Sequence, residues 1–486
     1  MKILIFECWH ESPQYETGLE IAEKHAEKND EVTYINIGRE LPFLEWHLFN
    51  QNNFKNKILN YFNHRKKYKL TKSVLNKEIK YHTTSLLKKD VKKALYEERT
   101  FSNINELKKY YWKNIDIGMA VASSLISITN DLNPETKYEH AENIKNLIHA
   151  AKLAGLSFNT WLDKIKPDLV YFRNGRVAVY RPILRICQQR GQNFKIHDRG
   201  CNKNHYVISP DLRHNFDMIH EQIQEAWNAE HDYKKKIKIA NNFYADRRAG
   251  KEQAWKAFLD KQKNATLPAK WDENKYNIVF YNSSISEYAA ISSEHNPNIL
   301  FNSQIDAIYY IANIIKIMKN TDFYIRLHPN LLNQSQKEKS LWLNLNHPVI
   351  NIISPDSRVD TYELMEHSDL VIAYMSTTGI EAAYYGKPVI ILAKSMYYKL
   401  GSVYFPENLV ELKDMIQSKK LKPKNIDGAI KYGYYMNTYG YKYHFFKPYS
   451  FLEGEFKGVN LQRKPLLLDF ASRLKHKIRR VVNYLK

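Results

Sequence analysis

The start of the chain alternates between short apolar runs and a helical pattern. Residues 2–6 and 32–37 are apolar runs of the length that a buried strand needs. Between them, residues 19–26 place apolar side chains at helical spacing. A strand, a helix and a second strand in this order predict a βαβ unit that opens a parallel sheet.

The same alternation returns further along the chain. Residues 167–172 and 194–197 are predicted strands, and residues 178–190 between them are a predicted helix. Ligands of open α/β sheets bind outside the carboxyl ends of the strands. The turn at 173–176 and the strand end at 197–200 are therefore candidate binding segments.

Two longer stretches have a helical period and many charges. Residues 45–115 are rich in Lys, Asn and Tyr and poor in Gly and Pro, which predicts a helical insertion in the first domain. Its most basic part, 62–69, is either a solvated helix face or a surface for the acceptor or a membrane. Residues 215–265 are also charged and helical, and we place an interdomain linker at about 262–275.

A second series of strands and helices follows the linker. Strands are predicted at 277–281, 323–327, 349–353, 370–373 and 388–392. Helices are predicted at about 304–319, 360–367 and 380–385, with Asp360 as the N-cap of the middle one. Two doubly wound, Rossmann-like α/β halves that face a cleft form the architecture called GT-B. The expected division is an N-terminal domain at 1–265, a C-terminal domain at 275–430 and a tail at 431–486.

The chain of 486 residues is strongly basic, with a formal net charge of +21. Such a charge favours anionic partners, which include nucleic acid, anionic lipid and acidic glycans. No recognised DNA- or RNA-binding motif accompanies it, so we expect no nucleic-acid partner.

Targeting and metal signals are weak. The three cysteines form no CxxC pair, so neither a disulfide framework nor a zinc site is expected, which fits a reducing cytoplasm. The first apolar run is too short for a signal peptide, and no apolar stretch reaches the roughly 18 residues that span a bilayer. The Asp-x-Asp pair that bridges a cation in many transferases is missing, so we expect no metal and no cofactor.

Residues 376–388 carry the strongest chemical signal. They follow a predicted strand and open a predicted helix, and the exposed amides of a helix N-terminus bind phosphate. An ordinary N-cap of a core helix is the alternative. A glycine in this turn lets the backbone approach a ligand closely. The candidate phosphate-binding residues are Ser376, Thr377, Thr378 and Gly379.

A second signal lies two βα steps earlier, at His328 and Pro329. A histidine held by a following proline at a strand end can present its ring to a phosphate, although a lone histidine is more often structural. Arg326 is two residues before His328, so it is expected on the same face of the strand. Ser283 and Ser284, after the first strand of this half, are expected to add hydroxyl groups to the same site.

Together these motifs resemble the donor half of bacterial capsule polysaccharide glycosyltransferases. The likeness consists of a strand ending in His-Pro, a Ser/Thr-rich turn, and Gly-Ile-Glu-Ala-Ala-x-x-Gly-Lys-Pro-Val-Ile. It is strongest to GT-B transferases that use CMP-activated ulosonic acids such as Kdo, sialic, pseudaminic and legionaminic acids. The similar segments are roughly 165–205 and 275–395.

The resemblance implies roles for individual residues. His328–Pro329 and Ser376–Thr378 would contact the CMP phosphate. Glu381 would hold the donor ribose, although a glutamate in a first helical turn also stabilises the helix without any ligand. The turn at 174–176 and the strand end at 197–200 also resemble segments of Kdo-type transferases. Without a metal, amides, His328 and Arg326 or Lys387 would meet the charge of the leaving group.

Catalysis would need a carboxylate or histidine of the first domain. Asp198 is the first candidate for a base or nucleophile, because the neighbouring Arg199 would keep it ionised. A structural pair with Arg199 is the alternative. Glu11 and His10, in the loop after the first strand, are the competing candidates. We expect a donor or acceptor carboxylate to be bound by Arg173, Asn174 and Arg176.

The end of the chain has apolar residues at helical spacing, from Leu466 to Leu485, with arginines and lysines between them. This basic amphipathic pattern suits a helix on anionic lipid, and a helix packed on the fold is the alternative. We expect a cytoplasmic protein that is peripheral on the inner membrane. Its acceptor would be a lipid-linked glycan or a polysaccharide.

Three other functions stay open. The enzyme could instead be a UDP- or GDP-hexose transferase, or a polymerase of the CDP-glycerol type. The chain could also be a scaffold of a capsule assembly complex without catalytic activity.

Overall fold

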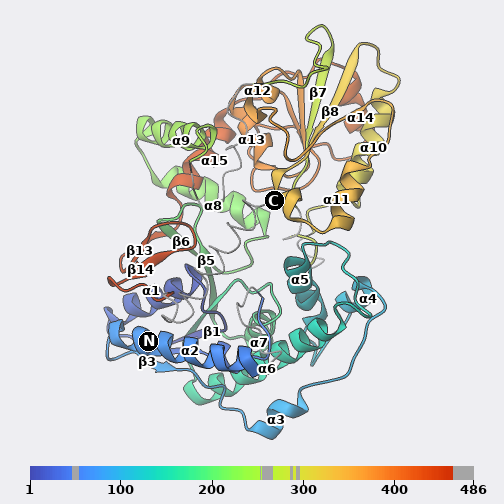
Figure 1. The fold of residues 1–486 in the computed structure, drawn as a ribbon. Helices are drawn as coiled ribbons and strands as arrows, with labels where there is room; N and C mark the ends of the chain where they lie inside the picture. The colour runs from blue at the N-terminus through green and yellow to red at the C-terminus, as the bar shows by residue number, and fades with distance from the viewer. Residues whose placement is uncertain (46–53, 252, 254–265, 285–287, 292–295, 463–486) are drawn as a thin grey trace, which may run out of the picture. The chain divides into compact units, whose positions relative to one another are not determined.

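The computed structural model of the chain describes residues 1–45, 54–251, 253, 266–284, 288–291 and 296–462. They form two compact units. The first unit comprises Met1–Ser124, Thr136–Pro210 and the chain from Tyr441 onward. The second unit comprises Leu125–Glu135 and Asp211–Gly440. Figure 1 shows the elements of both.

The first unit is built on a seven-stranded sheet. Across the sheet, the strands are β12 (Tyr441–Lys442), β6 (His205–Ser209), β5 (Phe194–Arg199), β4 (Leu169–Arg173), β1 (Lys2–Glu7), β2 (Glu31–Asn36) and β3 (Lys80–His82). The strands from β5 to β3 are parallel, and β6 and β12 are antiparallel to their neighbours. Strands β2 and β3 are added on one side of β1, and β4 and β5 on its other side, so the strand order reverses between β1 and β4. This position is the topological switch point, where Rossmann-like sheets bind ligands.

Helices cover both faces of this sheet. The helical elements that join its strands are α1 (Gln14–Ala26), η1 (Gly38–Glu40), α2 (Phe54–Val74), α3 (Lys89–Ala94), α4 (Ile104–Lys108), α5 (Ile117–Thr129), α6 (Ala141–Ile165) and α7 (Arg181–Gln189). Ile3 and Ile5 pack with Leu19 of α1, whereas Phe6, on the other face, meets Phe158 of α6 with ring centroids 5.2 Å apart. The alternation along β1 thus buries both faces of the strand.

The stretch at 45–115, predicted as a helical insertion, contributes a strand to the sheet. β3 pairs in parallel with β2, so α2 is the crossover helix between them. The basic run at 62–69 is also not a uniformly solvated face, because His64 and Lys67 are buried while Phe62 is exposed. Helical period alone did not reveal β3, because it is only three residues long.

The second unit has a five-stranded, entirely parallel sheet. Across the sheet, the strands are β11 (Val389–Ile391), β10 (Leu370–Ala373), β7 (Tyr276–Tyr281), β8 (Thr321–Arg326) and β9 (Ile350–Ile353). The strand order therefore reverses between β7 and β10, which is the switch point of this unit.

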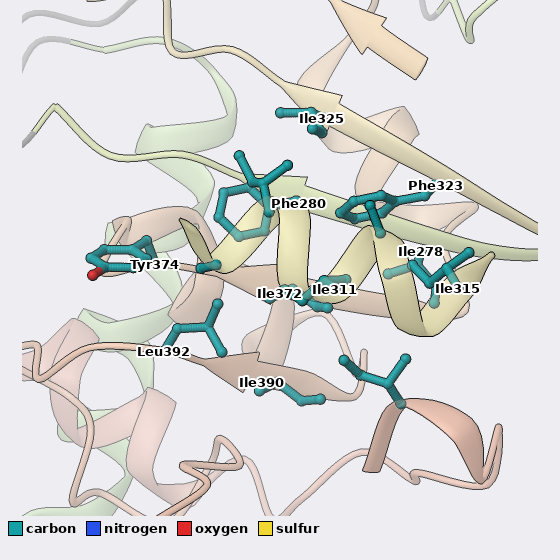
Figure 2. Close-up of a cluster of buried hydrophobic side chains, with 14 of the residues drawn as sticks. Ile278, Phe280, Ile311, Ile315, Phe323, Ile325, Ile372, Tyr374, Ile390 and Leu392 are labelled. Atoms are coloured by element: carbon teal, nitrogen blue, oxygen red, sulfur yellow. The ribbon is translucent and has the colours of Figure 1, made fainter. Parts of the chain in front are cut away.

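One face of this sheet forms the core shown in Figure 2. Ile278, Phe280 and Ile372 of the sheet pack with Ile311 of α10 (Gln304–Ile315) and Leu412 of α14 (Leu409–Gln417). The opposite face carries α12 (Thr361–Glu366) and α13 (Thr377–Tyr384), which follow β9 and β10. On that face, the Tyr281 hydroxyl donates to the Thr361 carbonyl at 3.1 Å. The predicted class, α/β with two Rossmann-like units, is confirmed.

The remaining elements connect the strands or close the chain. In the second unit they are α8 (Phe216–Ala229), α9 (Tyr233–Arg248), η3 (Pro329–Asn333), α11 (Gln336–Leu343) and α15 (Asp427–Thr438). In the first unit, β13 (Phe446–Pro448) and β14 (Gly454–Phe456) form an antiparallel pair. No helix in the described residues is long and apolar enough to cross a membrane. The predicted basic helix near the C-terminus falls in 463–486, outside the described residues.

The boundary between the units lies upstream of the linker predicted at 262–275. The chain changes units between Pro210 and Asp211, because α8 and α9 pack against α15 of the second unit. The Tyr244 hydroxyl of α9 donates to the Ala429 carbonyl of α15 at 2.7 Å. After Gly440 the chain returns to the first unit, where β12 pairs with β6. The expected tail therefore contains a strand of the first sheet.

Candidate functional site

Three loops of the second unit meet at the carboxyl ends of β7, β8 and β10. The loop after β7 hydrogen-bonds to both of the others. The Asn282 Oδ1 atom accepts from the His328 amide at 2.6 Å, and the Ser283 Oγ atom accepts from the Met375 amide at 3.1 Å. The loops around 328 and 376 are therefore held at one edge of the sheet, on either side of the loop after β7.

A glutamine of α10 fixes the middle of this arrangement. The Gln304 side chain accepts from the Ser283 amide at 2.8 Å and donates to the Ser283 carbonyl at 2.9 Å. Ser284 is also engaged, since its Oγ atom accepts from the Asn330 side chain at 3.0 Å. Sequence reasoning selected the two serines but missed Asn282 and Gln304, which position them.

His328 has a defined proton arrangement. Its Nδ1 atom accepts from the Asn330 amide at 3.0 Å, so the neutral ring carries its proton on Nε2. Burial, helped by the positive charges of Arg247 and Arg326, lowers the pKa of His328 from 6.5 to about 4. The ring is therefore a neutral N–H donor at physiological pH. Pro329 begins η3 directly after it.

Ser376 is the N-cap of α13, as the alternative reading of this segment proposed. Its Oγ atom accepts from the Thr378 amide at 3.4 Å and lies 2.8 Å from the Thr378 hydroxyl. Gly379 is required by packing, because a Cβ atom there would come within 2.6 Å of the Tyr397 hydroxyl oxygen. That hydroxyl in turn donates a very short hydrogen bond to the Ser376 carbonyl.

An arginine that the sequence did not single out joins this edge. Arg247 of α9 donates to Glu381 Oε1 at 2.8 Å and to the Thr377 hydroxyl at 3.3 Å. The Tyr362 hydroxyl donates to the other oxygen of Glu381 at 2.5 Å. Glu381 is buried, and both of its oxygens are engaged by protein groups. In this structure its observed role is therefore to hold Arg247 beside Thr377.

Two other cations expected near the phosphate donate to backbone carbonyls. The Arg326 side chain is buried and donates to the Ser354 carbonyl at 2.6 Å, so it supports the loop after β9. Burial lowers the pKa of Arg326. The Lys387 amine donates to the Ser368 carbonyl at 3.1 Å. Since Ser368 precedes β10, Lys387 lies at the amino edge of the sheet, away from the loops around 328 and 376.

A pocket that is open to solvent adjoins these loops. One part of its wall is polar and includes His328 with the loop after β7. The other part is formed by η3, α11 and the segment before residue 135. The lining residues are Leu132, Asn282, Ser283, Ser284, Gln304, His328, Leu331, Gln334, Glu338 and Trp342.

The first unit holds the predicted catalytic carboxylate at the end of β5. Asp198 accepts from the Asn174 side chain at 3.1 Å and from the Arg199 amide at 2.9 Å. Burial alone would raise the pKa of Asp198. The positive charges of Arg173 and Arg199, with these hydrogen bonds, outweigh burial and lower the pKa below its usual value. Asp198 is thus ionised at neutral pH.

The competing candidates lie in the loop after β1. His10 is buried against His64 of α2, with ring centroids 4.3 Å apart. Glu11 accepts from the His10 amide at 3.3 Å. Lys67, from the basic run of α2, donates to the His10 carbonyl, so that run supports this loop.

A buried network beneath these residues was not predicted. Glu7, at the end of β1, lies 2.5 Å from His197 Nε2 and accepts from the Tyr180 hydroxyl at 2.6 Å. The Tyr180 oxygen also accepts from the amides of Cys8 and Trp9, which fixes the start of the loop after β1. Glu7 ends a strand, and this position was the signal that could have identified it.

The predicted carboxylate-binding residues lie at the switch point of the first unit. The Cζ atom of Arg173, at the end of β4, lies over the Trp9 ring, 3.7 Å from the ring centroid. Arg176 donates to the Ser123 hydroxyl at 2.5 Å. Asn174 has a positive φ of 61° and accepts from the Arg176 amide at 3.1 Å, which shapes the turn between the arginines. Among the described residues, no group of three or more His, Cys, Asp and Glu is arranged to hold a metal ion.

Comparisons with known proteins give only distant likenesses. No protein-family model and no curated protein sequence matches the chain. One similar solved structure is the β-Kdo 2,4-transferase KpsC of Thermosulfurimonas dismutans. The sequences are 8% identical, the match covers 55% of this chain and 78% of that chain, and the TM-score is 0.37. The β-Kdo 2,7-transferase of the same KpsC gives 13% identity, 57% and 78% coverage, and a TM-score of 0.34.

Another similar structure is the UDP-GlcNAc 2-epimerase of Neisseria meningitidis bound to UDP-GlcNAc. It shows 11% identity, with 89% of this chain and 98% of that chain covered and a TM-score of 0.25. These low scores carry no information on individual residues. The chemistry of the two switch points therefore rests on the contacts described above.

Proposed function

We propose that this chain is a glycosyltransferase that moves an ulosonic acid from a CMP-activated donor to a capsular or other surface polysaccharide. The observation that carries the proposal is the convergence of the loops at 282–284, 328 and 375–378 at the switch point of the second unit. A nucleotide phosphate is the ligand that hydroxyls, a helix N-terminus and a neutral imidazole N–H suit at such an edge.

These groups would stabilise the CMP leaving group. The bond between the sugar carbon and the phosphate oxygen breaks, and negative charge grows on that phosphate. The Nε2 proton of His328, the hydroxyls of Ser376 and Thr377, and the positive charge of Arg247 would oppose this charge. Arg247 is already fixed by Glu381, so little reorganisation would be needed.

We propose Asp198 as the carboxylate that supports transfer, with Glu11 and His10 as the alternatives. Its lowered pKa keeps it ionised, which both a base and a nucleophile require. Replacement by asparagine preserves the size of the side chain and removes the charge. We expect Asp198→Asn to abolish transfer while CMP binding is kept. Persisting transfer would move the assignment to Glu11 or His10.

The donor nucleotide is tested by thermal unfolding of the full chain with CMP, UDP, GDP and CDP. A ligand that binds only the folded state raises the unfolding temperature, and at equal concentration a tighter ligand raises it more. The proposal expects the largest rise with CMP. A preference for UDP or GDP would indicate a hexose transferase, and a preference for CDP a polymerase of the CDP-glycerol type. No response to any nucleotide would favour a scaffold without catalytic activity.

Two substitutions of His328 separate its possible roles. Asparagine can still accept from the Asn330 amide, as Nδ1 does, but it lacks a donor at the position of Nε2. Glutamine can place an amide N–H near that position. We expect His328→Asn to lose the CMP-induced stabilisation and His328→Gln to keep part of it. Equal behaviour of both variants and the unaltered protein would contradict a phosphate contact by Nε2.

The acceptor and the membrane complete the proposal. The basic residues near the C-terminus would hold the enzyme on the anionic inner-membrane surface, close to a lipid-linked acceptor. This is tested by co-sedimentation with anionic and with zwitterionic vesicles. Binding only to anionic vesicles is expected, and equal binding to both kinds would contradict an electrostatic attachment.

A further inference from the structure

The switch point of the first unit contains buried polar atoms that lack partners. Among the described residues, Nε and Nη1 of Arg173, Nε of Arg176 and Nε1 of Trp9 have no hydrogen-bond partner. The three side chains are nearly buried, with 8%, 8% and 6% of their surface exposed. Buried N–H groups without partners are rare because each costs free energy. Four of them, on Trp9, Arg173 and Arg176, indicate a place built for an acceptor.

The donor geometry of Arg173 decides the shape of that acceptor. Its Cζ atom lies over the Trp9 ring, 3.7 Å from the ring centroid, so the indole covers one side of the guanidinium. The N–H groups lie in the plane of the guanidinium and point away from its edge. Each donor edge of a guanidinium pairs Nη2 with either Nε or Nη1, so a planar group with two acceptor oxygens, such as a carboxylate, can meet one of these edges with two parallel hydrogen bonds.

A glutamate near the two arginines supplies an acceptor. Glu45 is 4% exposed, and its Oε1 atom has no hydrogen-bond partner among the described residues. Burial raises the pKa of Glu45 to about 7, although the positive charges of Arg176 and Arg173 oppose this rise. The carboxyl group is thus available to a hydroxyl of a ligand.

We propose that Arg173, Arg176, Trp9 and Glu45 form a binding site for the carboxylate and an adjacent hydroxyl of an acidic sugar. The carboxylate accepts from the edge of Arg173 and from Arg176, and a sugar hydroxyl donates to Glu45. Glu45 and the ionised Asp198 both act on the charge of these arginines, so the site carries little net positive charge. A monoanion suits this balance, whereas a phosphate dianion would face both carboxylates.

The choice of an acidic sugar as the ligand rests on the proposed function, because an ulosonic acid carries a carboxylate and hydroxyls. It is separate in position, because the candidate phosphate site lies in the second unit and this site lies in the first. The two assignments can therefore fail independently, and the experiment measures both ligands on the same protein.

The test uses the full chain and titrates it with N-acetylneuraminate, Kdo, the methyl ester of each sugar, and inorganic phosphate. Binding is followed by ligand-observed NMR and by calorimetry. The variants are Arg173→Lys, Arg173→Met and Glu45→Gln. Arg190→Ala is the matched control, because Arg190 is an exposed arginine of the same unit that pairs with Asp163. CMP binding and the thermal unfolding curve are measured for every variant to establish that it folds.

The acids are expected to bind and their esters to bind at least about tenfold more weakly, because the ester has lost the charge and one acceptor. Arg173→Met should lose the acids, and Arg173→Lys should recover only a part of the binding, because lysine lacks the planar fork. Glu45→Gln should change the preference among sugars that differ in a hydroxyl. Arg190→Ala should behave as the unaltered protein.

The site would be overturned by equal binding of acid and ester, by unchanged binding in Arg173→Met, or by tighter binding of phosphate than of either acid. A protein that binds CMP but none of the acids would overturn this inference and leave the phosphate site of the second unit intact. A protein that binds the acids but no nucleotide would do the reverse.

Discussion

The pair formed by Arg247 and Glu381 gives the sharpest prediction, because it connects α9 to α13. The side chain of Glu381 is 4% exposed and that of Arg247 is 26% exposed. In Arg247→Met, the carboxylate would stay buried with only the hydrogen bond from Tyr362. We expect the variant to be clearly less stable than the unaltered protein.

The magnitude follows from the burial of the two partners. Removing one partner of a fully buried ion pair costs about 3–5 kcal/mol, because the other charge is left unpaired. Water reaches Arg247 in part, so we expect about 2–4 kcal/mol here. About 1 kcal/mol shifts the unfolding temperature of a domain of this size by roughly 2–4 °C. The expected decrease is therefore roughly 5–15 °C.

The assay is differential scanning calorimetry of a double-mutant cycle with Arg247→Met, Glu381→Gln and the combined variant. The combined variant leaves no buried charge, so it should be more stable than the sum of the single effects predicts, by about 1–3 kcal/mol. Arg248→Met is the control. That neighbouring arginine pairs with Glu366 on the surface, and its loss should cost at most about 1 kcal/mol. Additive effects in the cycle, or an Arg247→Met variant no less stable than the control, would refute the reasoning.

Three further predictions concern single positions. Gly379→Ala places a Cβ atom 2.6 Å from the Tyr397 hydroxyl oxygen. We therefore expect the free energy of unfolding, measured in urea, to fall by about 1–3 kcal/mol and CMP to bind more weakly. An unchanged free energy of unfolding and unchanged CMP binding would contradict the packing argument. The raised pKa of Glu45, about 7 against 4.5, means that the folded protein holds this proton more tightly than the unfolded chain does. The contribution of Glu45 to the free energy of unfolding is then complete below pH 4.5 and decreases by about 2–4 kcal/mol as the pH rises through 7. Urea titrations at several pH values measure this decrease, and the Glu45→Gln variant should not show it. Finally, a bound phosphate should raise the pKa of His328 from about 4 by about 1–3 units, measured by NMR of labelled histidine with and without CMP; an unshifted pKa would show that no anion lies beside the ring.

Several elements were readable from the sequence because their pattern is local. The strands at β7, β8 and β10 are short apolar runs bounded by polar turns, and their predicted bounds agree with the structure within about two residues. The cap of α12 was also local, since Asp360 accepts from the amides of Tyr362 and Glu363 as predicted. Local hydrogen bonds and alternation depend only on neighbours along the chain, so they can be read without the fold.

The domain boundary was not readable in this way. Helix α9 is charged over most of its surface and buries only a few residues, such as Ala240 and Phe243, against distant partners, and α8 also buries only a few residues. Their packing on α15 assigns them to the second unit, and α15 is nearly two hundred positions further along the chain. A helix with a small apolar face does not reveal which unit will cover it.

The sequence by itself determined the two βα series, the position of the candidate phosphate loops at strand ends, and the basic character of the chain. Only the tertiary structure decided the partners of the charged groups. It placed Arg247 on Glu381, directed Arg326 to a backbone carbonyl, and left the N–H groups of Arg173 without protein acceptors. The physical reason is that the end of a strand specifies which residues reach one edge of a sheet. The pairing of charged groups depends instead on their burial and on the distance between them, and elements far apart in the chain set both of these quantities.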